Sequence, residues 1–158
     1  MSDLKGLKRL RVLWLSHSNL TDISTVSDLK QLEVLYFSTN QLTDVSALAG
    51  LTKLGWLNLQ FNKLTDGQLK YIGGLKQLNV LALDGNNLTD ISALIRLTRL
   101  EKLHISSNKL TDRQLKHIEG LEQLQFLDLR DNPDLTKAQI AELQKALPKC
   151  KILSNPTK

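Results

Sequence analysis

Residues 75–88 read LKQLNVLALDGNNL, a stretch in which leucines recur at fixed intervals and an asparagine follows the last closely spaced pair. The same pattern begins six times, at positions 7, 29, 51, 75, 97 and 121, and successive starts are 22 or 24 residues apart. Such periods are typical of solenoids, because one repeat cannot bury its own apolar side chains and must stack on its neighbours. We therefore expect one domain over residues 1–158, built from six stacked repeats.

This pattern resembles the leucine-rich repeat family over almost the whole chain. The 22-residue units, such as residues 75–96 with their LTDISAL tail, resemble the repeats of bacterial internalins. The 24-residue units, with the tails LTDGQLKYIGG and LTDRQLKHIEG, resemble bacterial repeats that carry a short α-helix. The resemblance implies an α/β leucine-rich repeat solenoid, curved and right-handed, with a parallel β-sheet on its concave face and short 3₁₀-helices or α-helices on its convex face.

The resemblance also implies an interior row of hydrogen-bonding asparagines, one at the turn after each strand, at positions 40, 62, 86, 108 and 132. Ser18 holds the equivalent position in the first repeat, where its shorter side chain should bond less well. On the return segments, threonines at 65, 111 and 136 each precede a glutamine by three residues. That is the capping-box spacing, which predicts a short helix in each of these three segments.

Both ends of the chain carry partial repeats. Residues 136–153 predict a cap made of an amphipathic helix, stopped by Pro148, and half a repeat with Cys150 in a leucine position. Residues 2–7, SDLKGL, match the repeat tail SALAGL at 46–51, so the chain begins in the middle of a repeat. We expect its first edge to be covered either by a missing segment of a longer protein or by another chain.

Composition excludes several classes of protein. Leucine supplies 36 of the 158 residues and aromatic residues only 4%, while the formal net charge is +5. No apolar run reaches the roughly 20 residues of a membrane span, and residues 1–5 lack the apolar segment of a secretory signal. This predicts a cytoplasmic location, or secretion if the chain is a fragment of a longer precursor. Its single cysteine excludes an internal disulfide, and no cofactor or metal motif is present.

The concave face offers the candidate binding residues. Alternation along each strand places five of the seven aromatic residues on this face or its rim, at Trp14, Tyr36, Trp56, Phe61 and Phe126. Trp14, Tyr36 and Trp56, with Val12, Val34 and Val80, should form an apolar patch. His104, Asp128 and Arg130 should make the far half polar. Tryptophan, tyrosine and arginine are frequent binding hot spots, so we expect a non-catalytic scaffold that binds a protein partner here. Cross-strand packing alone is the competing explanation.

Four further interpretations concern other features of the sequence. The internalin-like repeats are compatible with a fragment of a secreted or surface adhesion or effector protein. A row of cations before the strands, at 8, 9, 30, 53, 76 and 99, could bind nucleic acid, although no nucleic-acid motif accompanies it. His104, Asp128 and Ser106 could be arranged as a catalytic triad, but an open sheet excludes no water, and we expect no enzyme. Aspartates at 22, 44, 66, 90 and 112 are expected to serve helical turns rather than to bind calcium.

Overall fold

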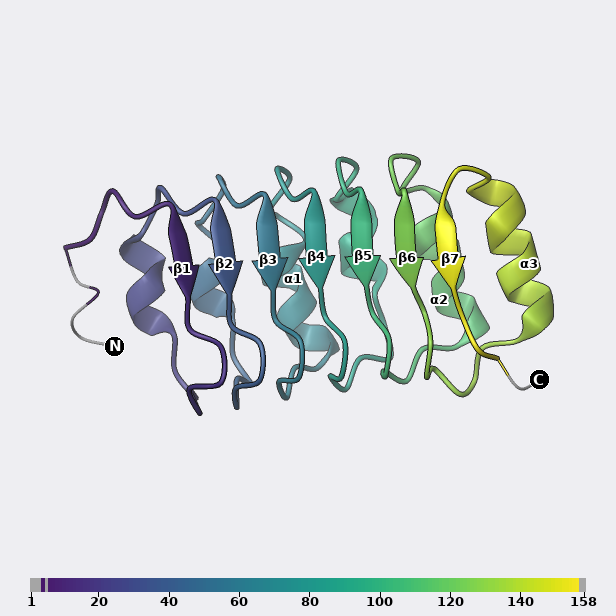
Figure 1. Ribbon diagram of the computed structural model, residues 1–158, viewed down its shortest axis with the longest axis horizontal. Coiled ribbons are helices and arrows are strands. Elements are labelled where there is room, and N and C mark those ends of the chain that lie inside the picture. Colours follow the sequence, from purple (N-terminus) through teal and green to yellow (C-terminus); the bar gives the residue numbers. More distant parts are fainter. Residues whose placement is uncertain (1–3, 5, 157–158) are drawn as a thin grey trace.

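Seven parallel strands lie side by side in chain order in the computed structural model, which describes residue 4 and residues 6–156 (Figure 1). The strands are β1 (Val12–Trp14), β2 (Val34–Tyr36), β3 (Trp56–Asn58), β4 (Val80–Ala82), β5 (Lys102–His104), β6 (Phe126–Asp128) and β7 (Lys151–Leu153). Each strand from β1 to β6 is followed by a segment that returns behind the sheet, so the chain coils in the right-handed sense (Figure 1). The predicted α/β solenoid is confirmed. Residues 2, 3 and 5 of the expected partial first repeat lie outside the described residues.

The return segments alternate with repeat length. The 22-residue repeats contain 3₁₀-helices, η2 (Ser24–Asp28), η3 (Ser46–Leu48) and η5 (Ser92–Arg96). The 24-residue repeats have two more residues and accommodate η4 (Asp66–Gln68) with α1 (Leu69–Ile72), and α2 (Asp112–Glu119). At the C-terminal end, α3 (Lys137–Ala146) leads into β7, and Cys150 is buried just before that strand. None of the helices in the described residues is long and apolar enough to cross a membrane.

Leucine fills the space between the sheet and the return segments. The central residues of successive strands pair in register, from Leu13 through Leu81 to Ile152 at the last strand. From the second strand to the sixth these residues are completely buried, and the residues two positions further along, such as Phe37 and Leu83, are buried as well. Each fully buried leucine contributes roughly 1.5–3 kcal/mol of transfer free energy. Because the core is completed by leucine, nearly all the aromatic residues are left for other places.

The asparagines form the predicted interior row, and each one joins two repeats. Asn86 is representative: its Oδ1 accepts from the Leu64 amide at 3.0 Å, while its Nδ2 donates to the carbonyls of Leu59 at 3.1 Å and Leu83 at 2.9 Å. The other four asparagines of the row bond in the same way. Ser18, in the first repeat, donates a single side-chain bond to the carbonyl of Ser16 at 3.1 Å.

The capping-box prediction is right about the helices and wrong about most of the bonds. Only Thr136 accepts a hydrogen bond from the amide of its glutamine, Gln139, at 3.3 Å. The Oε1 atoms of Gln68 and Gln114 instead accept from backbone amides of the preceding repeat, at residue 45 and residue 91, at 3.0 and 3.1 Å. Those two amides belong to buried residues with no helical partner, so a long acceptor from the next repeat satisfies them.

The repeated aspartates also follow repeat length. In the 22-residue repeats, Asp22, Asp44 and Asp90 each accept from the amide of the serine two residues later, at 2.7 Å. In the 24-residue repeats, Asp66 and Asp112 accept both the amide and the hydroxyl of a threonine in the next repeat. The expected role at helical turns is therefore confirmed for the first group, whereas the second group connects neighbouring repeats.

Replacing Asn86 by alanine should destabilise the protein by about 3 kcal/mol, because it leaves several buried backbone groups without partners. Urea unfolding followed by circular dichroism measures the loss. The matched control is Asn87→Ala, next in the chain but exposed, which should stay within about 0.5 kcal/mol of the parent. Equal effects of the two substitutions would contradict the structural role of the asparagine row.

Candidate functional site

The strand register places the predicted columns on one face of the sheet. Val12, Val34 and Trp56 lie in one row with residues 80, 102 and 126. Trp14 and Tyr36 lie in the next row with residues 58, 82, 104 and 128. This is the face directed away from the return helices, and we call it the concave face (Figure 1). The strands bring together residues that are 22 or 24 positions apart in the chain.

An aromatic patch covers the first three strands of the concave face, made of Val12, Trp14, Val34, Tyr36 and Trp56. The Trp14 and Tyr36 rings lie 4.7 Å apart between centroids, and the Tyr36 and Trp56 rings lie 6.0 Å apart. Trp14 is 70% exposed, Val12 49% and Trp56 36%. Large apolar side chains gathered and exposed in this way are uncommon on a protein surface that has no partner.

Val80, which the sequence placed in the same patch, offers little surface because only 7% of it is exposed. Its strand lies between Trp56 and Lys102 in the same row, and their larger side chains flank it. Ala82, one row further along the strand, is also buried. The aromatic patch therefore ends at the fourth strand.

Phe61 lies on the rim of the concave face, which is the edge at which the strands leave the sheet. Its backbone φ is 52°, in the left-handed region that a bulky residue rarely adopts, and its side chain is 55% exposed. The equivalent residue of every repeat from the first to the sixth has positive φ, but only Gly85 has no side chain there. A Cβ atom at Gly85 would overlap the ring of Phe61. The absence of a side chain at Gly85 therefore leaves room for the Phe61 ring on the rim. The sequence analysis missed this contact, although the Gly85-Asn86 pair could have indicated it.

The polar half of the face is organised around an ion pair between Arg130 and Asp128. Asp128 is 4% exposed, and the Arg130 guanidinium donates to its two carboxylate oxygens, from Nε at 3.0 Å and from Nη2 at 2.6 Å. Burial acts to raise the pKa of Asp128, but the hydrogen bonds from Arg130 outweigh it and hold the pKa below the usual value. Arg130 is therefore the hydrogen-bonding partner of Asp128, and the His104 ring packs on Phe126 with centroids 4.9 Å apart.

The side chains of His104, Asp128 and Ser106 are not arranged as a catalytic triad. The Ser106 hydroxyl donates to Asp84 Oδ1 at 2.7 Å, while His104 packs on an aromatic ring and Asp128 holds Arg130. Asp84, to which the sequence analysis assigned no role, is 5% exposed and also accepts from the Ser106 amide and from the side chain of Gln60. Its bonds make it a fixed polar element in the middle of the concave face.

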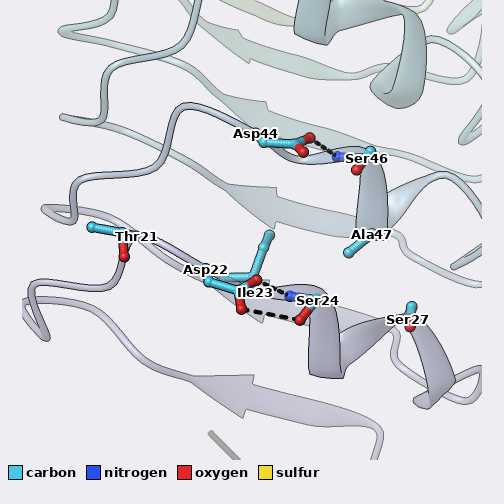
Figure 2. Close-up of a pocket in the computed structure, with 8 residues that line it drawn as sticks. All are labelled: Thr21, Asp22, Ile23, Ser24, Ser27, Asp44, Ser46 and Ala47. Atoms are coloured by element: carbon cyan, nitrogen blue, oxygen red, sulfur yellow. Dashed lines mark hydrogen bonds between the residues drawn. The ribbon is translucent and has the colours of Figure 1, made fainter.

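A separate groove of about 360 Å³ opens between the return segments of the first two repeats, lined by Thr21, Asp22, Ile23, Ser24, Ser27, Asp44, Ser46 and Ala47 (Figure 2). Figure 2 shows both carboxylates of the groove bonded to local serines: Asp22 to Ser24, and Asp44 to the amide of Ser46. These bonds hold the helical turns. Among the described residues, no group of three histidine, cysteine, aspartate or glutamate side chains is placed to hold a metal ion.

Arg130→Ala should raise the pKa of Asp128, because burial would then act without the opposing hydrogen bonds. In the parent protein the native pKa is depressed, so ionised Asp128 stabilises the fold above its unfolded pKa. That contribution is lost as the pH falls through the native pKa. Carbon-13 NMR titration of the carboxyl group measures the shift, with Arg96→Ala on the opposite side as the control. An unchanged pKa of Asp128 in Arg130→Ala would contradict this account.

Gly85→Ala should destabilise the fold by about 1–2 kcal/mol, from left-handed backbone strain and displacement of the Phe61 ring. In a Phe61→Ala background the cost of Gly85→Ala should be smaller, because the ring is no longer there to displace. Urea unfolding of the four proteins of this double-mutant cycle measures the coupling. Strictly additive effects would show that the ring does not depend on the glycine.

Comparison with known families and structures identifies similar proteins. Two family profiles match, one described as Leucine Rich repeats (2 copies) over residues 8–50 and one described as Leucine rich repeat over residues 76–133. No curated protein sequence matches the chain significantly.

Solved structures give closer comparisons. An internalin, inlF, from Listeria monocytogenes is 28% identical over 91% of this chain and 40% of its own, with a TM-score of 0.79. Internalin C2 from the same species is 26% identical over 99% of this chain and 66% of its own, with a TM-score of 0.82. The chain thus spans less than two thirds of either protein. The ectodomain of the receptor kinase GASSHO1/SCHENGEN3 from Arabidopsis thaliana, 22% identical over 95% of this chain and 18% of its own with a TM-score of 0.68, shares the fold.

Proposed function

This chain belongs to the leucine-rich repeat family, with repeats similar to those of bacterial internalins, and we propose that it binds a protein partner through the aromatic patch on its concave face. The family indicates a protein–protein interaction module. The finer proposal names the surface: the patch made of Val12, Trp14, Val34, Tyr36 and Trp56. Phe61 at the rim, Phe126 in contact with His104, and Arg130 at the exit of β6 would extend the contact towards the other strands.

The exposure of Trp14 is the observation that carries the proposal. The leucine core beneath the first strands is filled, yet a tryptophan with 70% of its surface exposed lies directly above it. Burying such a ring against a partner removes a large apolar area from water, and tryptophan and tyrosine dominate binding hot spots. The contacts among Trp14, Tyr36 and Trp56 limit how far each ring can move, which lowers the entropy cost of binding.

Cross-strand packing accounts for only part of this arrangement. Aromatic pairs of this kind contribute about 0.5–1.5 kcal/mol, so the rings do stabilise neighbouring strands. The Val12–Val34 pair on the same two strands would serve that purpose without large exposed rings. A packing role alone therefore leaves the most exposed tryptophan without an explanation.

The comparisons agree with binding as the class of function. The Arabidopsis receptor ectodomain was solved in complex with CASPARIAN STRIP INTEGRITY FACTOR 2, which shows one leucine-rich repeat domain of the same fold with a bound partner. The similarity to two internalins favours a second candidate of the same class, a part of a secreted or surface adhesion or effector protein.

The double substitution Trp14→Ala with Trp56→Ala should weaken binding of a genuine partner at least tenfold, because it removes the two largest rings of the patch. Proteins captured on the immobilised chain are identified by quantitative mass spectrometry, and their affinity is then measured by titration calorimetry. The control is Tyr71→Ala, which removes an aromatic ring from α1 on the opposite side of the sheet. If every captured protein bound the double variant and the control equally well, the concave-face proposal would be wrong.

A further inference from the structure

A row of cations borders the aromatic patch where the chain turns into each strand. We call it the basic edge, and its members are Lys8, Arg9, Lys30, Lys53, Lys76 and Arg99. All six side chains are exposed. The turns that carry them enter the first five strands, so the cations follow one another at the spacing of neighbouring strands, about 4.8 Å.

Two members of this row are bonded by neutral side chains rather than by acids. The ammonium group of Lys53 donates to Gln31 Oε1 at 2.5 Å, and the guanidinium of Arg99 donates to Gln77 Oε1 at 2.6 Å. Among the described residues, none of the six cations takes part in an ion pair. An amide oxygen orients a cation without cancelling its charge, so the edge keeps its positive potential.

Acidic residues do little to offset this charge. Over the first four repeats the carboxylates near the edge are Asp28 and Glu33. Glu33 is already bonded by Arg11 at 2.7 Å, and it also interacts electrostatically with Lys53. Further along the chain, Glu101 and Glu122 follow, and Glu122 takes the position that Lys76 has two repeats earlier. The excess of positive charge is therefore greatest beside the same strands that carry the aromatic patch.

We infer that the protein partner presents an acidic segment beside its apolar contact, and that the basic edge receives the carboxylates of this segment. This inference rests on the proposed function, because it gives the partner its chemistry at the same surface. The patch buries apolar side chains, and the adjoining cations attract the carboxylates that flank them. Such complementary charge speeds association and fixes the orientation of the partner more than it adds affinity.

Acidic protein fits this surface better than nucleic acid does. Bases stack on free, parallel ring faces, whereas the patch rings contact each other at interplanar angles of 58° and 37°. Further along the concave face, Asp84 adds a buried negative charge and Arg130 is already paired with Asp128, which disfavours a phosphate chain that continued across the strands. A polypeptide with both carboxylates and apolar side chains satisfies the edge and the patch together.

The test is binding of a synthetic peptide of alternating glutamate and leucine, followed by fluorescein anisotropy. Binding should weaken as salt rises, because exposed charges are screened. Lys53→Glu with Lys76→Glu should weaken it about tenfold or more. The matched control, Lys63→Glu with Lys109→Glu, changes the net charge equally but lies in the turns after the strands, and it should stay within about threefold.

Tryptophan fluorescence separates the two proposals, because Trp14 and Trp56 are the only tryptophans of the chain and both lie in the patch. Unlabelled glutamate–leucine peptide should shift their emission to the blue, and a glutamate–serine peptide should not. Edge-dependent binding without any emission change would support the edge and contradict the concave-face proposal. An emission change that survives the edge substitutions would support the patch and overturn the edge.

Three other results would overturn the inference. The first is an equal loss of binding in the edge variant and in its matched control, which would reduce the effect to net charge. The second is failure of the glutamate–leucine peptide to bind at low salt. The third is tighter binding of oligo(dT), with displacement of the peptide, which would assign the edge to nucleic acid instead.

Discussion

The interior row of asparagine amides is the interaction that sets the register of the whole solenoid. Each amide accepts from the backbone of the preceding repeat and donates to carbonyls of both its own repeat and the preceding one, as Asn86 does with Leu64, Leu83 and Leu59. These backbone groups lie inside the solenoid, where an unpaired one would cost about 1–3 kcal/mol. The row therefore requires every repeat to stack in one register, and that register aligns the buried leucines of neighbouring strands into a continuous core.

Because the asparagines set the register and the leucines fill the core, the residues of the concave face can differ from repeat to repeat. The strands are only three residues long, and only their middle residue packs in the leucine core. The residues on either side of it contact neighbouring strands and solvent, so core packing does not dictate their identity. At the N-terminal end these residues are mostly aromatic residues and valines, of which Val12, Trp14 and Trp56 are exposed. In the middle they are small and buried, as Val80 and Ala82 show. At the C-terminal end they form the ion pair between Asp128 and Arg130 and the contact between His104 and Phe126.

The face and its basic edge together describe a partner by its chemistry. An apolar floor built from Trp14, Tyr36 and Trp56 favours burial of apolar side chains, and the neighbouring cations favour carboxylates. The return segments behind the sheet have a structural role. Their glutamines and aspartates bond to backbone groups within and between repeats, which leaves those side chains engaged in holding the solenoid together.

Periodicity in the sequence was enough to predict the stacked parallel strands, the short helices that follow Thr65, Thr111 and Thr136, and the row to which each strand residue belongs, because a fixed period translates directly into spatial alignment. It could not predict which partner each polar side chain would choose. Gln114 has the spacing of a helix cap, yet it bonds the preceding repeat at Ile91, and Asp128 takes Arg130 as its partner. These hydrogen-bonding partners depend on distances, side-chain rotamers and burial. The residues concerned lie either more than 20 positions apart in the chain or close together where one strand ends. Only the tertiary structure decides these hydrogen-bonding partners, because a sequence period specifies which residues are neighbours but not which of their atoms form hydrogen bonds.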